Sequence, residues 1–327
     1  FFTFCDHDSI LFFSDRGVVY CMSAYQIPTA SRTARGVPIV QMLPINHEEK
    51  ITSIVPVSEF SNDEYLVMLT CSGYIKKTTL AAFRNIRANG LIAISLGEGD
   101  QLRWVRRARE EDSIIIGSSQ GMAIHFKTDH EQLRPLGRAT RGVKAMKLRS
   151  RDELISMDIL PAQVIASLAA IEDAQTQDLG SLPDEEETED ANNLSVAADQ
   201  EQELLESAGQ GPWVLVVTMG GYGKRVPVSQ FRLQNRAGMG VRATKFRKAK
   251  DQLAALRVVN EGDELMMVTS RGIIIRQLID AISPQSRMAT GVRVQRLDED
   301  DAIAAVALVP LTGEEEEETE EEMEEAL

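Results

Sequence analysis

The chain has 327 residues, with 35 basic and 50 acidic side chains and a formal net charge of −15. No apolar run reaches the roughly 18 residues of a membrane-spanning helix, and no signal-peptide pattern opens the sequence. Three widely spaced cysteines, Cys5, Cys21 and Cys71, predict a reducing compartment and no disulfide framework. Because the sequence begins with Phe1 rather than Met, we expect it to be cut from a longer protein.

The negative charge is confined to two segments. Residues 161–210 contain 13 acidic residues, residues 311–327 contain 10, and neither segment contains a basic one. The remaining 260 residues carry a net charge of +8. The sequence therefore predicts a basic body over residues 1–310, interrupted by an acidic insert and followed by an acidic tail. Both segments are expected to stay solvated, because like charges repel one another.

A pattern of strands and glycines occurs five times along the chain. Each copy has an apolar run, a polar turn that ends in a first glycine, a second strand, a linker, a second glycine and further apolar strands. The first glycines are Gly17, Gly73, Gly121, Gly221 and Gly272, and the second glycines are Gly36, Gly90, Gly142, Gly240 and Gly291. The period is roughly 50 residues once the insert is removed.

Each copy is expected to form about four short strands, since glycine permits the positive φ of a hairpin turn. Four-stranded units at this period predict an all-β fold of radially arranged blades. A two-sheet sandwich is the alternative, but it does not require five copies of one pattern. The expected blades span residues 8–57, 62–109, 110–160, 211–259 and 260–310, with 1–7 as the remnant strand of an upstream blade. A short helix is expected in the insert, over Pro161 to Ala174.

Basic residues recur at fixed positions of this repeat. Four residues before the second glycine stand Arg32, Arg138, Arg236 and Arg287, with Arg84 and Arg87 nearby in the second copy. Directly before a second glycine stand Arg35 and Arg141. Two and five residues after it stand Lys144, Lys147, Arg242, Lys245, Arg293 and Arg296. Three or four residues after the first glycine stand Lys76, Lys77, Lys224, Arg225 and Arg276.

Scattered surface charge would not favour the same positions of a repeat, so we interpret these residues as a belt of phosphate contacts around the rim. Such a belt suits duplex DNA that is bent along it and held by its backbone, with little reading of sequence. Aromatic residues make up only 5% of the chain, which argues against a platform for stacking single-stranded bases. The alternative is an ordinary solvated surface.

No catalytic or metal-binding motif stands out. The segment Gly220 to Arg225 resembles a phosphate loop only faintly, because Arg225 replaces the Ser or Thr of that motif. The four histidines form no metal-ligand spacing. Tyr74 and Tyr222 occupy one position of the repeat, which favours packing over chemistry. We therefore expect no catalytic residue, metal or cofactor within this chain.

Several stretches resemble the C-terminal domain of the bacterial DNA gyrase A protein. They are Asp8 to Tyr25, Arg35 to Val40, Gly73 to Thr78, and Gly221 to Arg225. The resemblance extends over residues 1–160 and 211–310, and the insert is not a general feature of the family. It implies a β-pinwheel, a propeller-like disk of six blades that exchange strands and wrap DNA around a basic perimeter.

The resemblance also implies a larger enzyme, an ATP-hydrolysing type II DNA topoisomerase that introduces negative supercoils. Its other parts would be the remainder of the gyrase A protein and the ATP-hydrolysing gyrase B protein, with ATP, Mg²⁺ and the catalytic tyrosine outside this chain. The Q-R-R-G-G-K-G-type box of the family's first blade is absent, and Asn235 to Gly240 occupies the equivalent place in a later blade. Two alternatives remain: the related domain of topoisomerase IV, and a propeller that binds acidic partner proteins.

The acidic tail is expected to compete with DNA for the basic body. Its glutamates are Glu314, Glu315, Glu316, Glu317, Glu318, Glu320, Glu321, Glu322, Glu324 and Glu325. Closely spaced carboxylates imitate the charge line of a DNA strand, and a short tether keeps them at an effective concentration on the order of millimolar. The alternative is a tail that only adds solubility.

Overall fold

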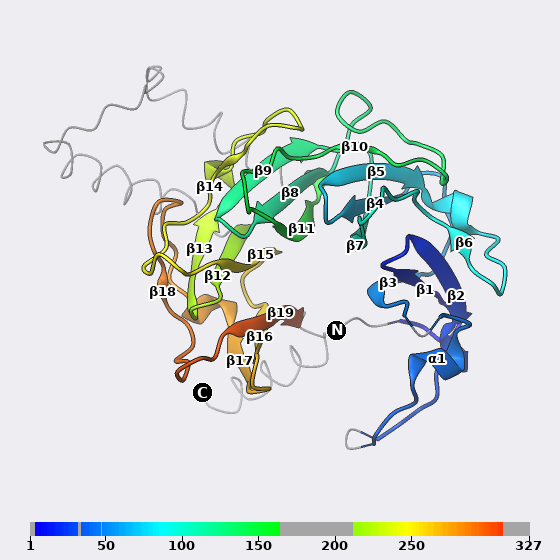
Figure 1. Ribbon diagram of the computed structural model, residues 1–327, viewed down its shortest axis with the longest axis horizontal. Helices are drawn as coiled ribbons and strands as arrows, with labels where there is room; N and C mark the ends of the chain where they lie inside the picture. Colours follow the sequence, from blue (N-terminus) through cyan, green and yellow to red (C-terminus); the bar gives the residue numbers. More distant parts are fainter. Residues whose placement is uncertain (1–3, 32–33, 47, 164–211, 310–327) are drawn as a thin grey trace, which may run out of the picture. The chain divides into compact units, whose positions relative to one another are not determined.

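A computed structural model describes residues 4–31, 34–46, 48–163 and 212–309 (Figure 1). Nearly all of the acidic insert, the whole acidic tail and Arg32 therefore lie outside the described residues. Among the described residues, no helix is long and apolar enough to cross a membrane. The chain divides into two compact units, which are described separately: an N-terminal unit of residues 2–162 and 233–241, and a C-terminal unit of residues 163–232 and 242–327.

The structure is all-β, as predicted. The strands of the first three repeats are β1 (Ser9–Ser14), β2 (Val18–Ser23), β3 (Ile51–Val57), β4 (Tyr65–Thr70), β5 (Tyr74–Thr79), β6 (Leu91–Ile92), β7 (Leu102–Ala108), β8 (Ser113–Ser118), β9 (Met122–Lys127), β10 (Val143–Lys144) and β11 (Leu154–Leu160). Those of the last two are β12 (Trp213–Thr218), β13 (Tyr222–Pro227), β14 (Val241–Arg242), β15 (Leu253–Val259), β16 (Glu264–Thr269), β17 (Ile274–Leu278), β18 (Val292–Arg293) and β19 (Ile303–Val309). Within the described ranges, helical structure comprises α1 (Ile39–Met42), short 3₁₀ turns at Ala24–Gln26, Leu80–Phe83, Val228–Gln230 and Ile279–Ala281, and the two residues Ala162 and Gln163.

Each repeat begins with a hairpin whose turn contains the first glycine. Apolar residues dominate the first strand, and in β1 the side chains from Ile10 to Phe13 are all at most 4% exposed. The turn glycines adopt positive φ, for example +77° at Gly17 and +81° at Gly73, which is the role predicted for them. The last strand of each repeat returns antiparallel to the first, as β3 does along β1.

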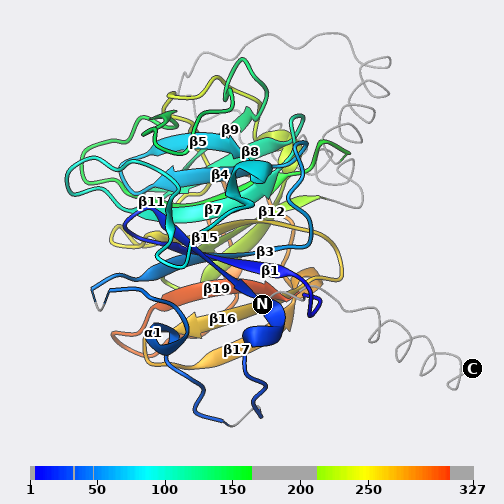
Figure 2. The same ribbon diagram turned by 90° about the vertical axis from the view of Figure 1, so that its right-hand side faces the viewer.

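The strands assemble into five antiparallel sheets, and four of these sheets have the four strands predicted for a blade. Their strand orders are β3-β1-β2-β6, β10-β5-β4-β7, β11-β8-β9-β14 and β15-β12-β13-β18, and the fifth is β17-β16-β19. Figure 2 shows β5, β4 and β7 lying side by side. The fifth repeat also forms four strands, but its sheet has three among the described residues because β18 lies on the fourth sheet.

The outer strand of each four-stranded sheet comes from the next repeat. For example, Val143 and Lys144 of β10 belong to the third repeat but pair with Ile75 and Tyr74 of β5 in the second sheet. The same exchange places β6, β14 and β18 on the sheets that precede them. Strand exchange, which the family resemblance implied, is thereby confirmed. In the first repeat, the residues after Gly36 form α1 instead of a strand.

Apolar side chains fill the space between neighbouring sheets within each unit. In the N-terminal unit one core joins the first and second sheets through Leu11, Val57, Leu66 and Val105, and a second core joins the second and third. The innermost strands β3, β7 and β11 contact one another in that order. In the C-terminal unit a third core packs β15 against β19. The inner strands are thus covered, and the exchanged strands lie at the opposite, outer edge of each four-stranded sheet.

Candidate nucleic-acid interface

The strand exchange sets where the predicted DNA contacts lie. Of the 19 basic residues predicted, Arg32 lies outside the described residues, and the other 18 fall into exposed, half-buried and buried groups. The exposed side chains are Arg35, Arg84, Arg87, Arg141, Lys144, Lys147, Arg242, Lys245, Arg276, Arg293 and Arg296. Most of them lie on or beside the exchanged strands. A cation there is accessible to a phosphate, so this exposed group is the candidate interface.

Arg138, Arg236 and Arg287, four residues before the second glycine, are half-buried. Each guanidinium donates a hydrogen bond to a backbone carbonyl: Arg138 Nη1 to Ala82 at 2.9 Å, Arg236 Nε to Gln132 at 2.6 Å, and Arg287 Nη1 to Arg242 at 2.7 Å. These arginines fasten the segment that leads into the exchanged strand. The N–H groups that make no such bond stay candidates for phosphate contact. The recurrence of these arginines in the sequence reflects their hydrogen bonds to backbone carbonyls at least as much as contact with DNA.

Lys76 and Lys224 are buried, with exposed fractions of 0% and 1%. The Lys76 ammonium donates hydrogen bonds to the carbonyls of Gly137 and Thr140, at 3.0 and 3.3 Å, and to that of Arg138. The Lys224 ammonium bonds three carbonyls of the fifth repeat in the same way. Neither group can reach a phosphate in this structure, and we remove both from the predicted contacts.

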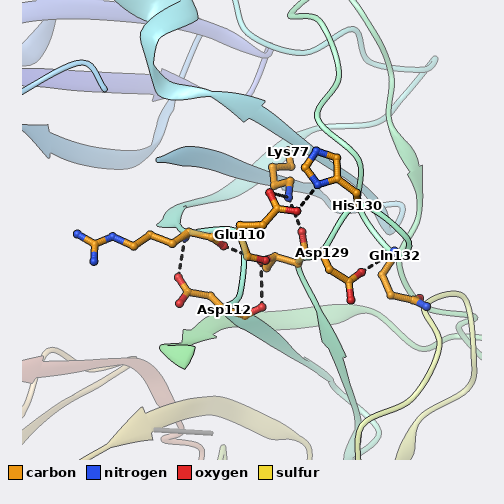
Figure 3. A network of polar contacts seen from close by, with 8 residues as sticks. Lys77, Glu110, Asp112, Asp129, His130 and Gln132 are labelled. Atoms are coloured by element: carbon orange, nitrogen blue, oxygen red, sulfur yellow. Dashed lines mark hydrogen bonds and ion pairs between the residues drawn. The ribbon is translucent and has the colours of Figure 1, made fainter. Parts of the chain in front are cut away.

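Lys77 and Arg225 are buried beside a carboxylate. Lys77 Nζ lies 3.3 Å from Glu110 Oε2 and also donates to the Thr128 carbonyl, while Glu110 contacts His130 (Figure 3). Burial lowers the pKa of Lys77, and Glu110 partly offsets this effect. Arg225 Nη1 lies 2.8 Å from Asp280 Oδ1. These two cations serve the fold rather than DNA, which corrects the prediction made for them.

Arg276 occupies the same position of the fifth repeat as Lys77 and Arg225 in theirs. Its side chain is exposed but forms an ion pair with Glu264. All three residues of this column therefore pair with an acidic side chain of their own unit. The signal that separates this column from the exposed cations is strand alternation. Adjacent strand residues point to opposite faces, so two consecutive lysines in a central strand cannot both face solvent.

Tyrosine rings support several of the exposed cations. The Tyr74 ring lies 4.0 Å from the Arg141 guanidinium and 5.0 Å from the Lys144 ammonium. In the C-terminal unit the Tyr222 ring lies 5.8 Å from the guanidinium of Arg293 and 5.1 Å from that of Arg247. The packing role predicted for the two tyrosines agrees with these contacts. Arg247 was missed, although Arg149 stands at the same position of the third repeat, seven residues after the second glycine.

The hydrogen bond from Arg293 lowers the pKa of the Tyr222 hydroxyl, and the charges of Arg293, Arg247 and Lys248 add to the effect. These three cations beside one ring produce a positive potential there. Such a potential attracts any polyanion that approaches the exchanged strand β18.

A basic groove lies beside the exchanged strand β6. It has a volume of about 800 Å³ and is lined by Arg84, Arg87 and Arg138 together with Asn85 and Asn89. Three guanidinium groups and two amides offer hydrogen-bond donors to phosphate oxygens without selecting a base. The second repeat lacks cations directly after its second glycine, since Leu91 and Ile92 stand there. This groove is where the second repeat can take part in the interface.

The described residues contain no group of three or more His, Cys, Asp or Glu side chains that could hold a metal ion. In the second to fifth repeats, the acidic residues that recur before the last strand instead accept hydrogen bonds from the hairpin turns. Asp152 accepts from Gln120 N at 3.0 Å, and Asp251 accepts from Gly220 N at 2.8 Å. Their carboxylates therefore serve turn geometry.

The buried Lys76 predicts a dependence of stability on pH. Burial lowers its pKa to about 8, and the charge of Arg138 adds to the effect. Above pH 8 the folded chain releases this proton while the unfolded chain keeps it up to a pKa near 10.5, so the free energy of unfolding rises with pH in that window. Above about pH 10 the buried Tyr20, whose pKa is raised to about 12, acts in the opposite direction.

We expect urea unfolding to give a higher free energy at about pH 9.5 than at about pH 7.5, by on the order of 2 kcal/mol. The Lys76→Met variant should lack most of this rise. Parallel curves for the two proteins would show that the Lys76 proton is not the origin of the effect.

Sheets that exchange strands, with exposed cations at the exchanged edge, define a propeller-type protein suited to binding polyanions. A family model described as the DNA gyrase C-terminal domain, a β-propeller, matches residues 8–58, 64–109, 112–161, 212–260 and 263–310. The chain therefore belongs to the family of DNA gyrase A C-terminal domains, which confirms the resemblance seen in the sequence.

Relatives and solved structures agree with this assignment. The chain is 65% identical to the DNA gyrase A protein of Synechocystis over 327 residues, all of this chain and 36% of that one. It is 41% identical to the chloroplastic/mitochondrial DNA gyrase A protein of Arabidopsis thaliana, over 95% of this chain and 30% of that one. The chain thus spans about a third of the length of these relatives.

Two solved structures share the fold. One is the C-terminal domain of DNA topoisomerase IV, with a TM-score of 0.70 and 20% identity, covering 93% of this chain and 80% of that one. The other is a DNA gyrase A C-terminal domain, with a TM-score of 0.67 and 22% identity, covering 93% of this chain and 83% of that one. The fold alone fits both enzymes, and it is the sequence match that places the chain with gyrase.

Proposed function

We propose that this chain is a domain that binds duplex DNA and bends it along the exchanged edges of its blades. The observation that carries the proposal is the exposed cations two and five residues after the second glycine. They are Lys144, Lys147, Arg242, Lys245, Arg293 and Arg296. Contacts of this kind hold the phosphate backbone irrespective of sequence, and each one releases a counterion, so binding is expected to weaken steeply with salt.

We further propose that the domain serves a holoenzyme with the remainder of the gyrase A protein and the ATP-hydrolysing gyrase B protein. Membership of the gyrase family supports this role. In such an assembly the bent DNA would help the holoenzyme to introduce negative supercoils, as an isomerase of DNA topology. ATP and Mg²⁺ would act in other parts of the assembly, and the place of action would be the bacterial cytoplasm, with the nucleoid DNA.

The decisive experiment tests wrapping of DNA around the domain rather than binding alone. A relaxed circular plasmid is incubated with increasing amounts of the 327-residue chain, a nicking-closing topoisomerase is added, and the protein is then removed. If the domain wraps DNA, the linking number of the closed plasmid shifts in proportion to the bound protein. A propeller that binds acidic partner proteins, or a DNA-binding domain that does not bend its ligand, would leave the linking number unchanged.

The acidic tail supplies a further prediction, drawn from its sequence. Removing every residue after Thr312 should tighten DNA binding at low salt, because ten glutamates no longer compete with phosphates for the basic body. The gain should shrink as salt rises, since screening weakens both attachments. The measurement is a pair of DNA titrations, full-length and truncated, at two salt concentrations. Equal affinities of the two proteins at low salt would show that the tail does not compete with DNA and only adds solubility.

A further inference from the structure

Two segments of the chain are held in the same way by a buried ammonium group. Lys76 Nζ bonds the carbonyls of Gly137, Arg138 and Thr140 in the N-terminal unit. Lys224 Nζ bonds those of Ser286, Arg287 and Ala289 in the fifth repeat, at 2.8, 2.7 and 2.8 Å. Counted from the second glycine, the carbonyls lie five, four and two residues upstream in both cases. We call each arrangement of one ammonium and three carbonyls a lysine cage.

The cage uses the full bonding capacity of the ammonium group, which has three N–H donors and no acceptor. Three carbonyls that turn inward toward one nitrogen fix the backbone of the segment between them. Removing the donor would leave the Arg138 carbonyl without this partner, at a cost of about 1–3 kcal/mol unless the segment rearranges to reach water. The carbonyls of Gly137 and Thr140 would keep their bonds from Thr140 Oγ1 and Ser95 N, at 2.8 and 3.1 Å. The segment is therefore expected to rearrange when the lysine is lost.

The caged segment leads directly into the proposed DNA contacts. Arg141, Gly142, Val143 and Lys144 follow the first cage, and Lys144 pairs with Tyr74 on the strand that also carries Lys76. The second cage is followed by Val292 and Arg293, and Arg293 pairs with Tyr222 on the strand that carries Lys224. In each case a single strand, β5 or β13, does two things. Its lysine holds the backbone that precedes the exposed cation, and its tyrosine pairs with the cation residue itself.

The other blades show that the cage is not a requirement for building a blade. Tyr20 and Ile124 occupy the equivalent position of the first and third sheets, and both sheets form with four strands. In the third sheet, backbone bonds from Ala237 N to the Ala145 carbonyl and from Lys147 N to the Gly238 carbonyl hold the corresponding segment. The ammonium therefore fixes the backbone conformation of one particular segment. It does not supply a stabilising contact that all blades share.

We propose that Lys76 and Lys224 are positioning residues for DNA binding: they touch no phosphate themselves but hold the segments that present Arg141, Lys144 and Arg293 to DNA. This inference rests on the proposed function. It differs from a direct contact because the side chains are covered, and from a purely structural role because its effect is transmitted through specific cations.

The test combines Lys76→Met with Arg141→Ala/Lys144→Ala in a double-mutant cycle, all in the 327-residue chain. DNA affinity is measured with a labelled duplex over a range of salt concentrations. Removing the two cations should flatten the slope of log K against log salt by about 1.8, near 0.9 for each phosphate contact. Lys76→Met alone should weaken binding about tenfold at low salt and flatten the slope by more than one contact. Added to the double substitution, it should change affinity less than twofold.

Amide hydrogen exchange measures how firmly the cage holds its segment, and it requires no DNA. In Lys76→Met the amides of residues 137–144 should exchange faster, while the inner strands keep their protection. Ile124→Met, at the same position of the third blade, is the matched control and should leave residues 137–144 unchanged. Lys224→Met repeats the test in the fifth repeat, over residues 286–293, should the Lys76 variant fail to fold.

Two results would overturn the proposal. One is a loss of affinity from Lys76→Met that is as large in the Arg141→Ala/Lys144→Ala background as in the wild type, because the lysine then acts independently of those cations. The other is an unchanged exchange rate over residues 137–144. If the wild-type chain itself fails to bind duplex DNA, the proposed function fails with this inference, and the exchange data still show whether the cage holds its segment.

Discussion

Replacing Gly142 with alanine should lower the free energy of unfolding by about 3 kcal/mol, mostly by disrupting the exchanged strand β10. Gly142 has a φ of +91°, and a left-handed conformation costs an L-residue about 1–2 kcal/mol. A Cβ at this position would also lie 2.4 Å from the carbonyl oxygen of Ile75, which is backbone and cannot turn aside. Relieving that overlap must push β10 away from β5, which adds about 1–3 kcal/mol.

Gly36 provides the matched control, because it is the second glycine of the first repeat. Its φ is +74°, but a Cβ there would meet nothing within 4 Å. Gly36→Ala should therefore cost only the conformational part, about 1 kcal/mol. The two variants are compared by urea denaturation of the 327-residue chain. Equal losses would show that the close approach to Ile75 does not matter and that conformation alone explains both.

The difference between Gly142→Ala and Gly36→Ala measures the effect of the close backbone approach at the second glycine. In the second sheet this glycine lets the chain of one repeat lie directly on the backbone of the preceding blade. Gly240 shows the same close approach, with a Cβ position 2.3 Å from the Ala123 carbonyl oxygen. The first repeat has the glycine but no acceptor strand among the described residues, so its space is open. The glycine thus marks the exchange point of the fold.

The sequence predicted the blades because their signals are local. The apolar first strand, the glycine at positive φ and the roughly 50-residue period are all readable within one repeat, and the insert appeared as a break in that period. Strand exchange is different, since β6, β10, β14 and β18 are two residues long. A strand that short has no periodicity of its own, and its partner lies in another repeat. Only the resemblance to a family indicated it.

The candidate site was predicted only in part, for a related reason. The recurrence of Lys144, Arg242 and Arg293 at one position correctly indicated exposed cations. Recurrence alone could not separate them from Lys76 and Lys224, because a cation that holds a repeated turn recurs just as regularly as one that faces a repeated ligand. What separates the two groups is burial: Lys76 and Lys224 are covered by the segments before Gly142 and Gly291, and those segments belong to the next repeat.

Replacing Arg141, Lys144 and Lys147 together with alanine should weaken binding of any duplex on the order of 100-fold at low salt. All three side chains are exposed, whereas the neighbouring Arg138 is half-buried and bonded to Ala82, so it is left in place. Three lost contacts worth about 1 kcal/mol each give that factor. The slope of log K against log salt should flatten by about 2.7, near 0.9 for each lost contact.

The control is a second triple substitution with the same loss of charge. Lys50, Arg103 and Lys127 are also exposed and belong to none of the recurring positions. Replacing them with alanine lowers the net charge equally, so it measures the long-range attraction alone. That variant should bind with a salt slope within about half a unit of the wild type. Equal slopes for the two triple variants would mean that DNA binding depends only on the total charge of the domain. Loss of binding to one DNA sequence only would mean that these residues read bases. A selective loss in the first triple would place the DNA backbone along the exchanged strand that the cage of Lys76 holds.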